Sequence, residues 1–147
     1  NSRGIGWEFV HVCIDDASRL AYVEVLDAET ATSCAGFLER ALAFYRNHAI
    51  RVRSVMTDNA FAYRSHSFNT VCQRFRIRHV MTRPYRPQTN GKAERFIQTL
   101  LREWAYVRAY TSSRSRTAAL PRWLWRYNHR RPHGSLNNNP PISRIGH

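Results

Sequence analysis

Residues 85–96 read YRPQTNGKAERF, and residues 55–59 read VMTDN. The longer stretch carries Glu94 in the first turn of a predicted helix, and the shorter one places Asp58 directly after a predicted strand. The chain has 23 Lys and Arg residues against 10 Asp and Glu, so each carboxylate lies in a positive background. An acid at a strand end and an acid at a helix start, in a basic protein, indicate a divalent-metal site that faces a phosphate backbone.

The composition indicates a globular protein with a polyanionic partner. The 147 residues are 43% hydrophobic, which is enough to build the core of one domain. The formal net charge is +13, and nucleic acid is the polyanion that this charge favours. The alternatives are an incidental surface excess of charge and a membrane-surface role. The second would require a basic amphipathic helix, and none stands out.

The three cysteines, Cys13, Cys34 and Cys72, form no C-x-x-C pair. An odd number without that spacing argues against a disulfide framework and against a zinc ribbon, and it fits a reducing cytoplasm. Cys13 and Cys72 lie in apolar segments and are predicted to be buried. The sequence shows no apolar run of about 20 residues and no signal peptide, so we expect a cytoplasmic protein that is nucleoid-associated when it acts. A first residue other than Met suggests the middle of a longer protein.

The predicted order of elements is that of an α/β domain with a mixed sheet. Apolar periodicity and turn signals predict strands at residues 7–14, 20–26, 51–57 and 77–82, and helices at 30–48, 67–75, 92–107 and 117–129. Two prolines and a glycine predict a loop at 83–91. We assign residues 1–129 to the core domain and residues 130–147 to an extended, basic, Pro/Asn-rich tail.

Residues 56–59 (MTDN) and 85–96 together resemble the catalytic core of insertion-sequence transposases and retroviral integrases. Residues 14–20 (IDDASRL) and 127–133 (YNHRRPH) match flanking segments of the same family, so the resemblance covers nearly the whole chain. It implies an RNase H-like fold and metal-dependent cleavage of DNA ends with their transfer to a target strand. It also implies DNA as the partner, a homo-oligomeric active complex, and three carboxylates that hold two Mg²⁺ (or Mn²⁺) ions.

In this resemblance Asp58 matches the second acid of the family and Glu94 the third. The first acid lies in an earlier, central strand of the family, upstream of the strand predicted at residues 7–14, and we expect this chain to lack that segment. Asp15 or Asp16 could replace it, although both fall where the family has a structural turn. Ala60 stands where the family commonly has Gly, and it would strain the turn if a positive φ is needed there.

The basic and polar residues around the two acids are predicted to contact phosphates and bases of DNA. They are Arg83, Arg86, Gln88, Asn90, Lys92 and Arg95. The alternative is a solvated basic loop. His129 and His133 have a metal-ligand spacing, but Pro132 lies between them and no acid is near, which favours a basic tail over a zinc site. Trp104, Trp123 and Trp125 are predicted to be core or interface residues.

The sequence therefore supports three hypotheses about function. The first is an N-terminally truncated polynucleotidyl transferase core, inactive alone because the first acid is missing. The second is a catalytically inactive DNA-binding remnant of a transposase. The third, a nuclease acting on RNA–DNA hybrids, is disfavoured by residues 85–96. We also expect the isolated chain to be marginally stable and prone to association, because a missing central strand leaves unpaired strand edges.

Overall fold

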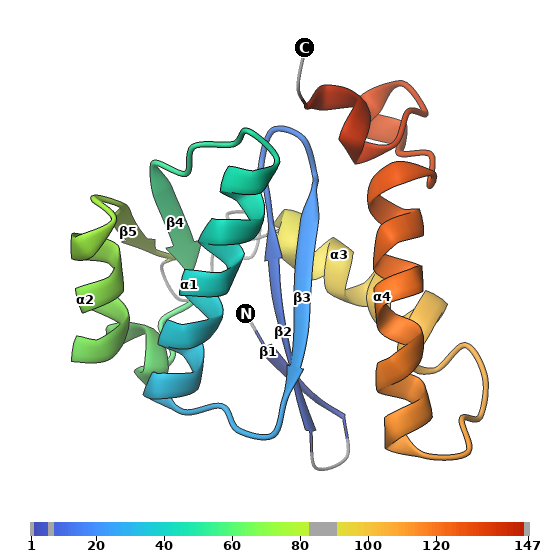
Figure 1. Cartoon of the computed structure of the whole chain (residues 1–147), viewed down its shortest axis with the longest axis horizontal. Helices are drawn as coiled ribbons and strands as arrows, with labels where there is room; N and C mark the ends of the chain where they lie inside the picture. The colour runs from blue at the N-terminus through green and yellow to red at the C-terminus, as the bar shows by residue number, and fades with distance from the viewer. Residues whose placement is uncertain (1, 6–7, 83–90, 146–147) are drawn as a thin grey trace. The chain divides into compact units, whose positions relative to one another are not determined.

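Two small β-sheets form the framework of the computed structural model, which describes residues 2–5, 8–82 and 91–145 (Figure 1). The first sheet has the order β1-β2-β3, with β1 at Ser2–Ile5, β2 at Glu8–Ile14 and β3 at Ala21–Leu26. The second consists of β4 (Ser54–Thr57) and β5 (Arg78–Met81), which pair in parallel. The predicted α/β class is confirmed, and antiparallel and parallel pairing both occur, but the described strands form two sheets rather than one mixed sheet.

Strand β1 was not predicted, because its four residues are too few to show a periodic pattern. It pairs antiparallel with β2, with Ser2 opposite His11 and Ile5 opposite Glu8. Among the strands of the described residues, β4 pairs only with β5. The strands predicted at 7–14 and 51–57 therefore do not pair directly with each other in place of the missing central strand. The expected marginal stability of the chain stays a prediction.

The chain divides into two compact units. Unit 1 comprises Asn1–His11 and Glu24–Gly91, and unit 2 comprises Val12–Val23 and Lys92–His147. The predicted boundary between core and tail at residue 129 stays a prediction. No helix within the described residues is long and apolar enough to cross a membrane.

Unit 1 packs two helices against β4 and β5. Helix α1 (Ala31–Asn47) begins at Thr30, whose side chain accepts a hydrogen bond from the Ser33 N–H, and Ser33 reciprocates in a capping box. Helix α2 (His66–Arg74) follows a 3₁₀ turn at Phe61–Arg64 and is capped by Ser65. Both helices start within one residue of the prediction. They share a core made of Cys34, Ala35, Leu38, Tyr63, Phe68, Val71, Cys72 and Ile77.

Unit 2 is built on helices α3 (Gly91–Leu100) and α4 (Ser113–His129). The single helix predicted at 92–107 ends earlier, because a π-helical turn at Leu101–Ala105 follows α3. Helix α4 begins four residues before the prediction, because Ser112 and Ser115 form a capping box. The aromatic rings of Phe96, Trp123 and Tyr127 pack on one another, with Phe96 and Tyr127 centroids 5.0 Å apart.

Several smaller predictions also have clear outcomes. The tail is not simply extended: residues Gly134–Leu136 and Pro141–Arg144 form 3₁₀ turns that bury Leu136 and Pro141. Trp104 and Trp123 are buried as predicted, whereas Trp125 is 49% exposed and stacks on His129. All three cysteines are free thiols. Cys72 is buried as predicted, while Cys13 is only half-buried.

A single buried amide joins α4 to the start of β3 within unit 2. Asn128 Oδ1 accepts a hydrogen bond from the Ala21 N–H at 2.8 Å, and Asn128 Nδ2 donates one to the Ala21 carbonyl at 2.9 Å. Both residues are buried, so water cannot replace these bonds. The amide thus satisfies both backbone groups of a residue that lies 107 positions away in the sequence.

Replacing this amide is expected to destabilise unit 2. Asn128→Ala leaves a buried N–H and a buried C=O without partners, which should lower the free energy of unfolding by roughly 2–4 kcal/mol. Gln98→Ala removes an exposed amide from α3 and is the matched control, expected to change stability by less than about 0.5 kcal/mol. Urea denaturation measures both, and equal effects of the two substitutions would refute the role of Asn128.

A pH dependence is expected from His79 in unit 1. Its Nε2 lies 2.7 Å from Thr57 Oγ1, and burial lowers its pKa below the ordinary value. The folded state therefore favours the neutral ring. Its contribution to stability is complete above pH about 6.5 and falls as the pH drops below that value, because the unfolded chain takes up the proton first. We expect His79→Gln to flatten the pH profile of the unfolding midpoint between about pH 6.5 and 5. An unchanged profile would contradict this assignment.

Candidate active site and nucleic-acid interface

Asp58 lies where the sequence predicted, directly after β4 and exposed to solvent. Its Oδ1 accepts a hydrogen bond from the Ala60 N–H at 2.9 Å, which closes a tight turn. The hydroxyl of buried Thr57 donates to the Asp58 carbonyl at 2.9 Å. The backbone that carries the carboxylate is therefore held in place at the end of the strand, where ligand sites of α/β sheets collect.

The expectation of strain at Ala60 is not met. Ala60 has φ −65° and ψ 151°, an extended conformation that any residue adopts without cost. No glycine is needed at this position, because Asp58 makes its turn by a side-chain hydrogen bond rather than by a left-handed backbone.

Glu94 lies in the first turn of α3 and is half-buried. The helix buries Ala93, Ile97 and Leu100, which recur every three or four residues and fix the rotation of α3 within unit 2. The helix dipole favours an anion at this end. Asp58 belongs to unit 1 and Glu94 to unit 2, so the approach of their carboxylates stays a prediction.

The two candidates for a third metal ligand both have other contacts. Asp15 Oδ2 accepts hydrogen bonds from the Ser18 N–H at 2.9 Å and the Ser18 hydroxyl at 2.7 Å. Asp16 Oδ1 lies 2.5 Å from Lys92 Nζ. The contacts of Asp15 are those of a turn, and Asp16 pairs with a lysine of α3, so both acids have a structural explanation. Among residues 2–5, 8–82 and 91–145, no group of three or more His, Cys, Asp or Glu side chains is arranged to hold a metal ion.

Of the six predicted DNA contacts, Lys92 and Arg95 lie within the described residues. Arg83, Arg86, Gln88 and Asn90 fall outside them. Lys92 reaches from α3 to the 15–19 turn, but its partner Asp16 has a side chain that is 86% exposed. An ion pair in such a position contributes about 0–1 kcal/mol, so Lys92 can exchange Asp16 for a phosphate at little cost. Arg95 is exposed on the same helix.

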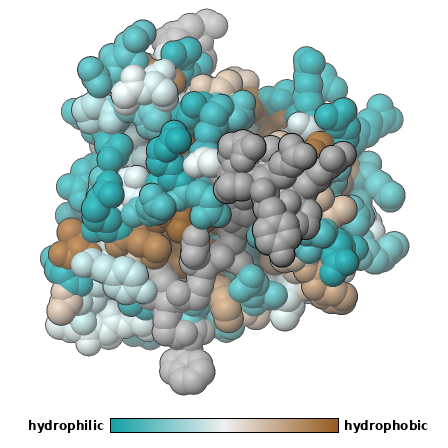
Figure 2. Space-filling model, turned by 180° about the vertical axis from the view of Figure 1, so that it is seen from behind, coloured by the Kyte–Doolittle hydropathy of each residue, from teal (hydrophilic) through white to brown (hydrophobic). Residues whose placement is uncertain are grey.

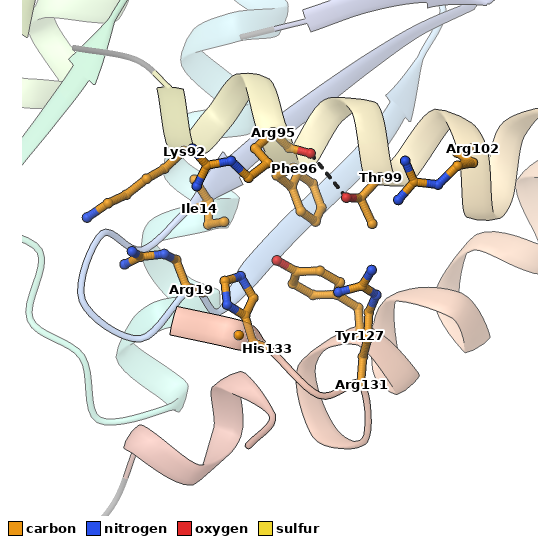
Figure 3. Close-up of a pocket in the computed structure, with 11 residues that line it drawn as sticks. Ile14, Arg19, Lys92, Arg95, Phe96, Thr99, Arg102, Tyr127, Arg131 and His133 are labelled. Carbon is orange, nitrogen blue, oxygen red and sulfur yellow. Dashed lines mark hydrogen bonds between the residues drawn. The ribbon is translucent and has the colours of Figure 1, made fainter. Parts of the chain in front are cut away.

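A pocket of about 290 Å³ opens in unit 2 beside α3 (Figure 3). Figure 3 shows Lys92, Arg95 and Arg102 coming from α3 and the turn that follows it, Arg19 from the β2–β3 turn, and Tyr127 and Arg131 from the end of α4. The complete lining is Ile14, Arg19, Lys92, Arg95, Phe96, Thr99, Arg102, Tyr127, Arg131, His133 and Gly134. Five of these side chains carry a permanent positive charge.

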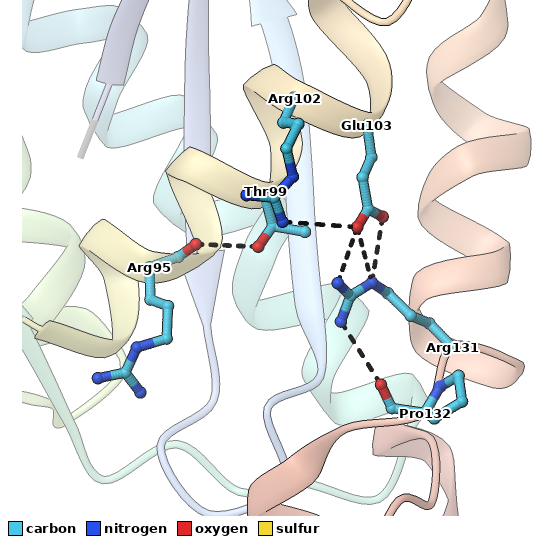
Figure 4. A network of polar contacts seen from close by, with 6 residues as sticks. All are labelled: Arg95, Thr99, Arg102, Glu103, Arg131 and Pro132. Carbon is cyan, nitrogen blue, oxygen red and sulfur yellow. Dashed lines mark hydrogen bonds and ion pairs between the residues drawn. The ribbon is translucent and has the colours of Figure 1, made fainter.

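The carboxylate of Glu103 holds Arg131, one of the residues that line this pocket (Figure 4). Glu103 accepts hydrogen bonds from Arg131 Nε at 3.1 Å and from Arg131 Nη2 at 2.7 Å, while Arg102 Nη2 lies 3.9 Å away. Burial raises the pKa of Glu103, but Arg131 more than offsets this and holds the pKa below its ordinary value. Glu103 therefore stays ionised and fixes the Arg131 guanidinium by a bidentate contact.

The remaining polar groups of the pocket are uncharged near neutral pH. Burial raises the pKa of Tyr127 to about 12, so its phenol keeps the proton and can donate it in a hydrogen bond. Burial and the nearby charges of Arg19, Arg131 and Arg95 lower the pKa of His133. Within residues 127–133 the sequence supported an interpretation only for His129 and His133, and no motif singled out Arg19 or Arg102 as ligands. The sequence signal for Arg19 and Arg102 is only the general density of basic residues.

Figure 2 shows that the surface seen from behind Figure 1 is largely hydrophilic, as the composition suggests. Three large apolar side chains of unit 1 nevertheless remain exposed: Met56 on β4, Met81 on β5, and Phe61 in the 3₁₀ turn that follows Asp58. Their exposure was not predicted, because strand patterns do not report which sheet faces are covered.

Comparison with known proteins identifies the family. Residues 2–87 and residues 75–141 each match a family described as integrase core domain. The chain is 26% identical over 98 residues to an uncharacterized protein of insertion element IS136 from Agrobacterium tumefaciens, with 67% of this chain covered. It spans 50% of the length of that protein, and less than a tenth of two retroviral or retrovirus-related polyproteins that also match.

Two solved structures share the fold. The catalytic core domain of BIV integrase matches with a TM-score of 0.76 and 21% identity, covering 98% of this chain and 89% of that one. The simian T-cell lymphotropic virus intasome, solved in complex with the PP2A regulatory subunit B56 gamma, matches with a TM-score of 0.71 and 25% identity, covering 88% of this chain and 47% of that one. Together with the family match over residues 2–87, they confirm the RNase H-like fold, and the chain belongs to the integrase core domain family.

Proposed function

We propose that this chain supplies the catalytic core of an enzyme that cuts DNA ends and joins them to a target strand in transposition or integration. The observation that carries the proposal is the placement of two acids at the positions that the family resemblance implies. Asp58 lies at the end of β4, and Glu94 lies in the first turn of α3. Both fall inside the segments that match the integrase core family.

Asp58 and Glu94 are the residues that we assign to a divalent metal. Carboxylate oxygens are the ligands that Mg²⁺ and Mn²⁺ prefer. The carboxylate of Asp58 is exposed, and one of its two oxygens accepts the hydrogen bond from the Ala60 N–H. A bound metal would supply activation of a water or 3′-hydroxyl and stabilise the leaving oxygen. The chain contributes the orientation: Thr57 holds the Asp58 backbone, and the buried face of α3 fixes the rotation of Glu94.

DNA is the substrate that we assign, with several copies of the chain in the active complex. The net charge of +13 favours a polyanion, and the intasome relative is an assembly of the same fold. We assign backbone and base contacts to Lys92 and Arg95, and to Arg83, Arg86, Gln88 and Asn90 in the adjoining segment. Lys92 at the start of α3 adds its charge to that of the helix N-terminus.

The alternative is a DNA-binding remnant without activity. It is favoured by the contacts of Asp15 with Ser18 and of Asp16 with Lys92, which give both candidates for the first acid another role. A strand-transfer assay with Mg²⁺, on this chain and on a version extended upstream, decides between the two. We expect no joining of DNA ends by the 147 residues alone, and joining by the extended version only if the enzyme hypothesis is right.

Metal binding provides a direct test of the two acids. We expect Asp58→Asn and Glu94→Gln each to weaken Mn²⁺ binding by tenfold or more, because each removes a charged oxygen ligand; tenfold corresponds to about 1.4 kcal/mol. Asp27→Asn removes an equally exposed carboxylate from unit 1 and should leave affinity unchanged. Electron paramagnetic resonance of free Mn²⁺ measures all four proteins. Equal affinity of the wild type and both site variants would remove the metal assignment.

DNA binding should not require the metal ligands. We expect the affinity for duplex DNA, measured by fluorescence anisotropy in EDTA, to fall linearly with the logarithm of salt concentration, because the contacts are to phosphates. Asp58→Asn should leave affinity unchanged or slightly raised, because it removes a negative charge close to the backbone. An affinity that does not change with salt would contradict the electrostatic account and the proposed substrate.

A further inference from the structure

We infer that the pocket beside α3 in unit 2 binds a phosphodiester group of the DNA backbone, with Arg19, Arg95 and Arg102 as its cationic ligands. This inference rests on the proposed function, since it names a contact to the same substrate. It goes further in assigning a role to the β2–β3 turn and to the end of α4, which neither the two acids nor the loop before α3 involve.

The charges around the pocket are unbalanced. Five permanent cations line it, and only two carboxylates compensate them: Asp16 pairs with Lys92, and Glu103 pairs with Arg131. No ion pair closer than 3.9 Å is found for Arg19, Arg95 or Arg102 within the described residues. The segments outside that description contain no Asp or Glu. Arg102 has only the 3.9 Å contact with Glu103, which Arg131 already holds. Arg19 donates a hydrogen bond to the Asp16 carbonyl, which leaves its charge without a carboxylate partner. A bound anion would therefore relieve the mutual repulsion of the guanidinium groups that line the cavity.

The hydrogen-bond donors of the pocket are of the right kind for phosphate. Each guanidinium presents a planar fork that suits two oxygens of one phosphate group. Tyr127 adds a hydroxyl donor, which keeps its proton because burial raises the pKa to about 12. The Thr99 hydroxyl already donates to the Arg95 carbonyl at 3.1 Å. The side chains of Ile14 and Phe96 supply apolar surface that a sugar can contact. The volume of about 290 Å³ lies near the lower end of small-ligand sites, which suits a single backbone unit.

The packing of unit 2 holds in place the backbone segments that carry these donors, while the side chains of Arg95 and Arg102 are exposed. Glu103 fixes Arg131, which forms a wall of the pocket rather than a mobile ligand. The Phe96 and Tyr127 rings pack at 5.0 Å and join α3 to α4 beneath it. Asn128 ties α4 to β3, next to the turn that carries Arg19. Because the backbone of the three segments is already in place, binding of a ligand costs little backbone entropy.

A pair of double variants tests the inference. Arg95→Gln/Arg102→Gln removes two pocket cations, and Arg122→Gln/Arg126→Gln removes two exposed cations of α4 that do not line the pocket. Binding of a short random-sequence duplex is measured in EDTA from about 50 to about 200 mM salt. We expect the pocket variant to bind on the order of tenfold more weakly and to lose about 1 from the slope of log affinity against log salt, because one phosphate contact disappears. The control should keep the wild-type slope.

Different failures have different meanings. If the wild type does not bind DNA, the proposed function fails together with this inference. If the wild type binds but the pocket and control variants lose the same slope, or neither loses any, only the pocket assignment is wrong. Arg95→Lys/Arg102→Lys keeps both charges and should keep the slope with weaker affinity, which separates loss of charge from loss of folding. Thermal unfolding of every variant accompanies the titrations.

Inorganic phosphate and an acidic peptide separate the possible ligands. We expect the duplex to raise the pKa of His133 in nuclear magnetic resonance titrations, because the bound phosphate counteracts the charges of Arg19, Arg131 and Arg95; Asp16, Glu103 and Lys92 are the other charged groups around the pocket. The rise should be absent in Arg95→Gln/Arg102→Gln. A rise with inorganic phosphate or a poly-glutamate peptide but not with the duplex would overturn the assignment to DNA.

Discussion

The scarcity of carboxylates constrains this molecule more than any other feature of its sequence. The chain has ten Asp and Glu residues against 23 Lys and Arg residues, and several of these acids form ion pairs and hydrogen bonds that stabilise the fold. Glu24 makes a bidentate contact with Arg40, and Glu39 pairs with Arg74. Asp15, Asp16 and Glu103 hold the turn and the end of α4 in unit 2. The acids in these ion pairs are not available to neutralise the other cations of the chain.

The positive excess is therefore concentrated where no acid is available. In unit 2 the half-buried carboxylate of Glu103 fixes Arg131, with Arg102 3.9 Å away. Arg19 and Arg95 have no carboxylate partner within the described residues. Like charges in such an arrangement cost free energy, and a fold with only marginal stability tolerates them when hydrophobic packing offsets the cost. Here the packing comes from Phe96, Trp123 and Tyr127. A cluster of cations that the core must hold against repulsion is the arrangement expected of a site that meets phosphate.

The sequence predicts those parts of the fold whose cause is local. Thr30 and Ser33 lie three residues apart, so the start of α1 could be placed to within a residue. Asp58 and Glu94 were found by motif, and their positions at a strand end and in a first helical turn are confirmed. Features with distant causes were missed. The Asn128–Ala21 contact spans 107 residues, and the pocket draws on three separate segments. Strand β1 forms by pairing with the edge of β2, and its four residues are too few to show a strand pattern in the sequence.

The acids are proposed to bind metal and the cations to bind phosphate, and this separation of roles bears on the two functional hypotheses. The phosphate site that we propose at Arg19, Arg95 and Arg102 needs no carboxylate, whereas the proposed metal site needs both Asp58 and Glu94. DNA affinity and metal affinity can therefore be lost independently, and measured DNA binding does not distinguish an enzyme from an inactive remnant. Only the acids carry that information. Asp58 is informative in particular, because its turn is built by the carboxylate itself: Asn at this position keeps an oxygen for the Ala60 N–H and removes only the charge. The residue thus separates the structural role of the turn from the chemistry proposed for it.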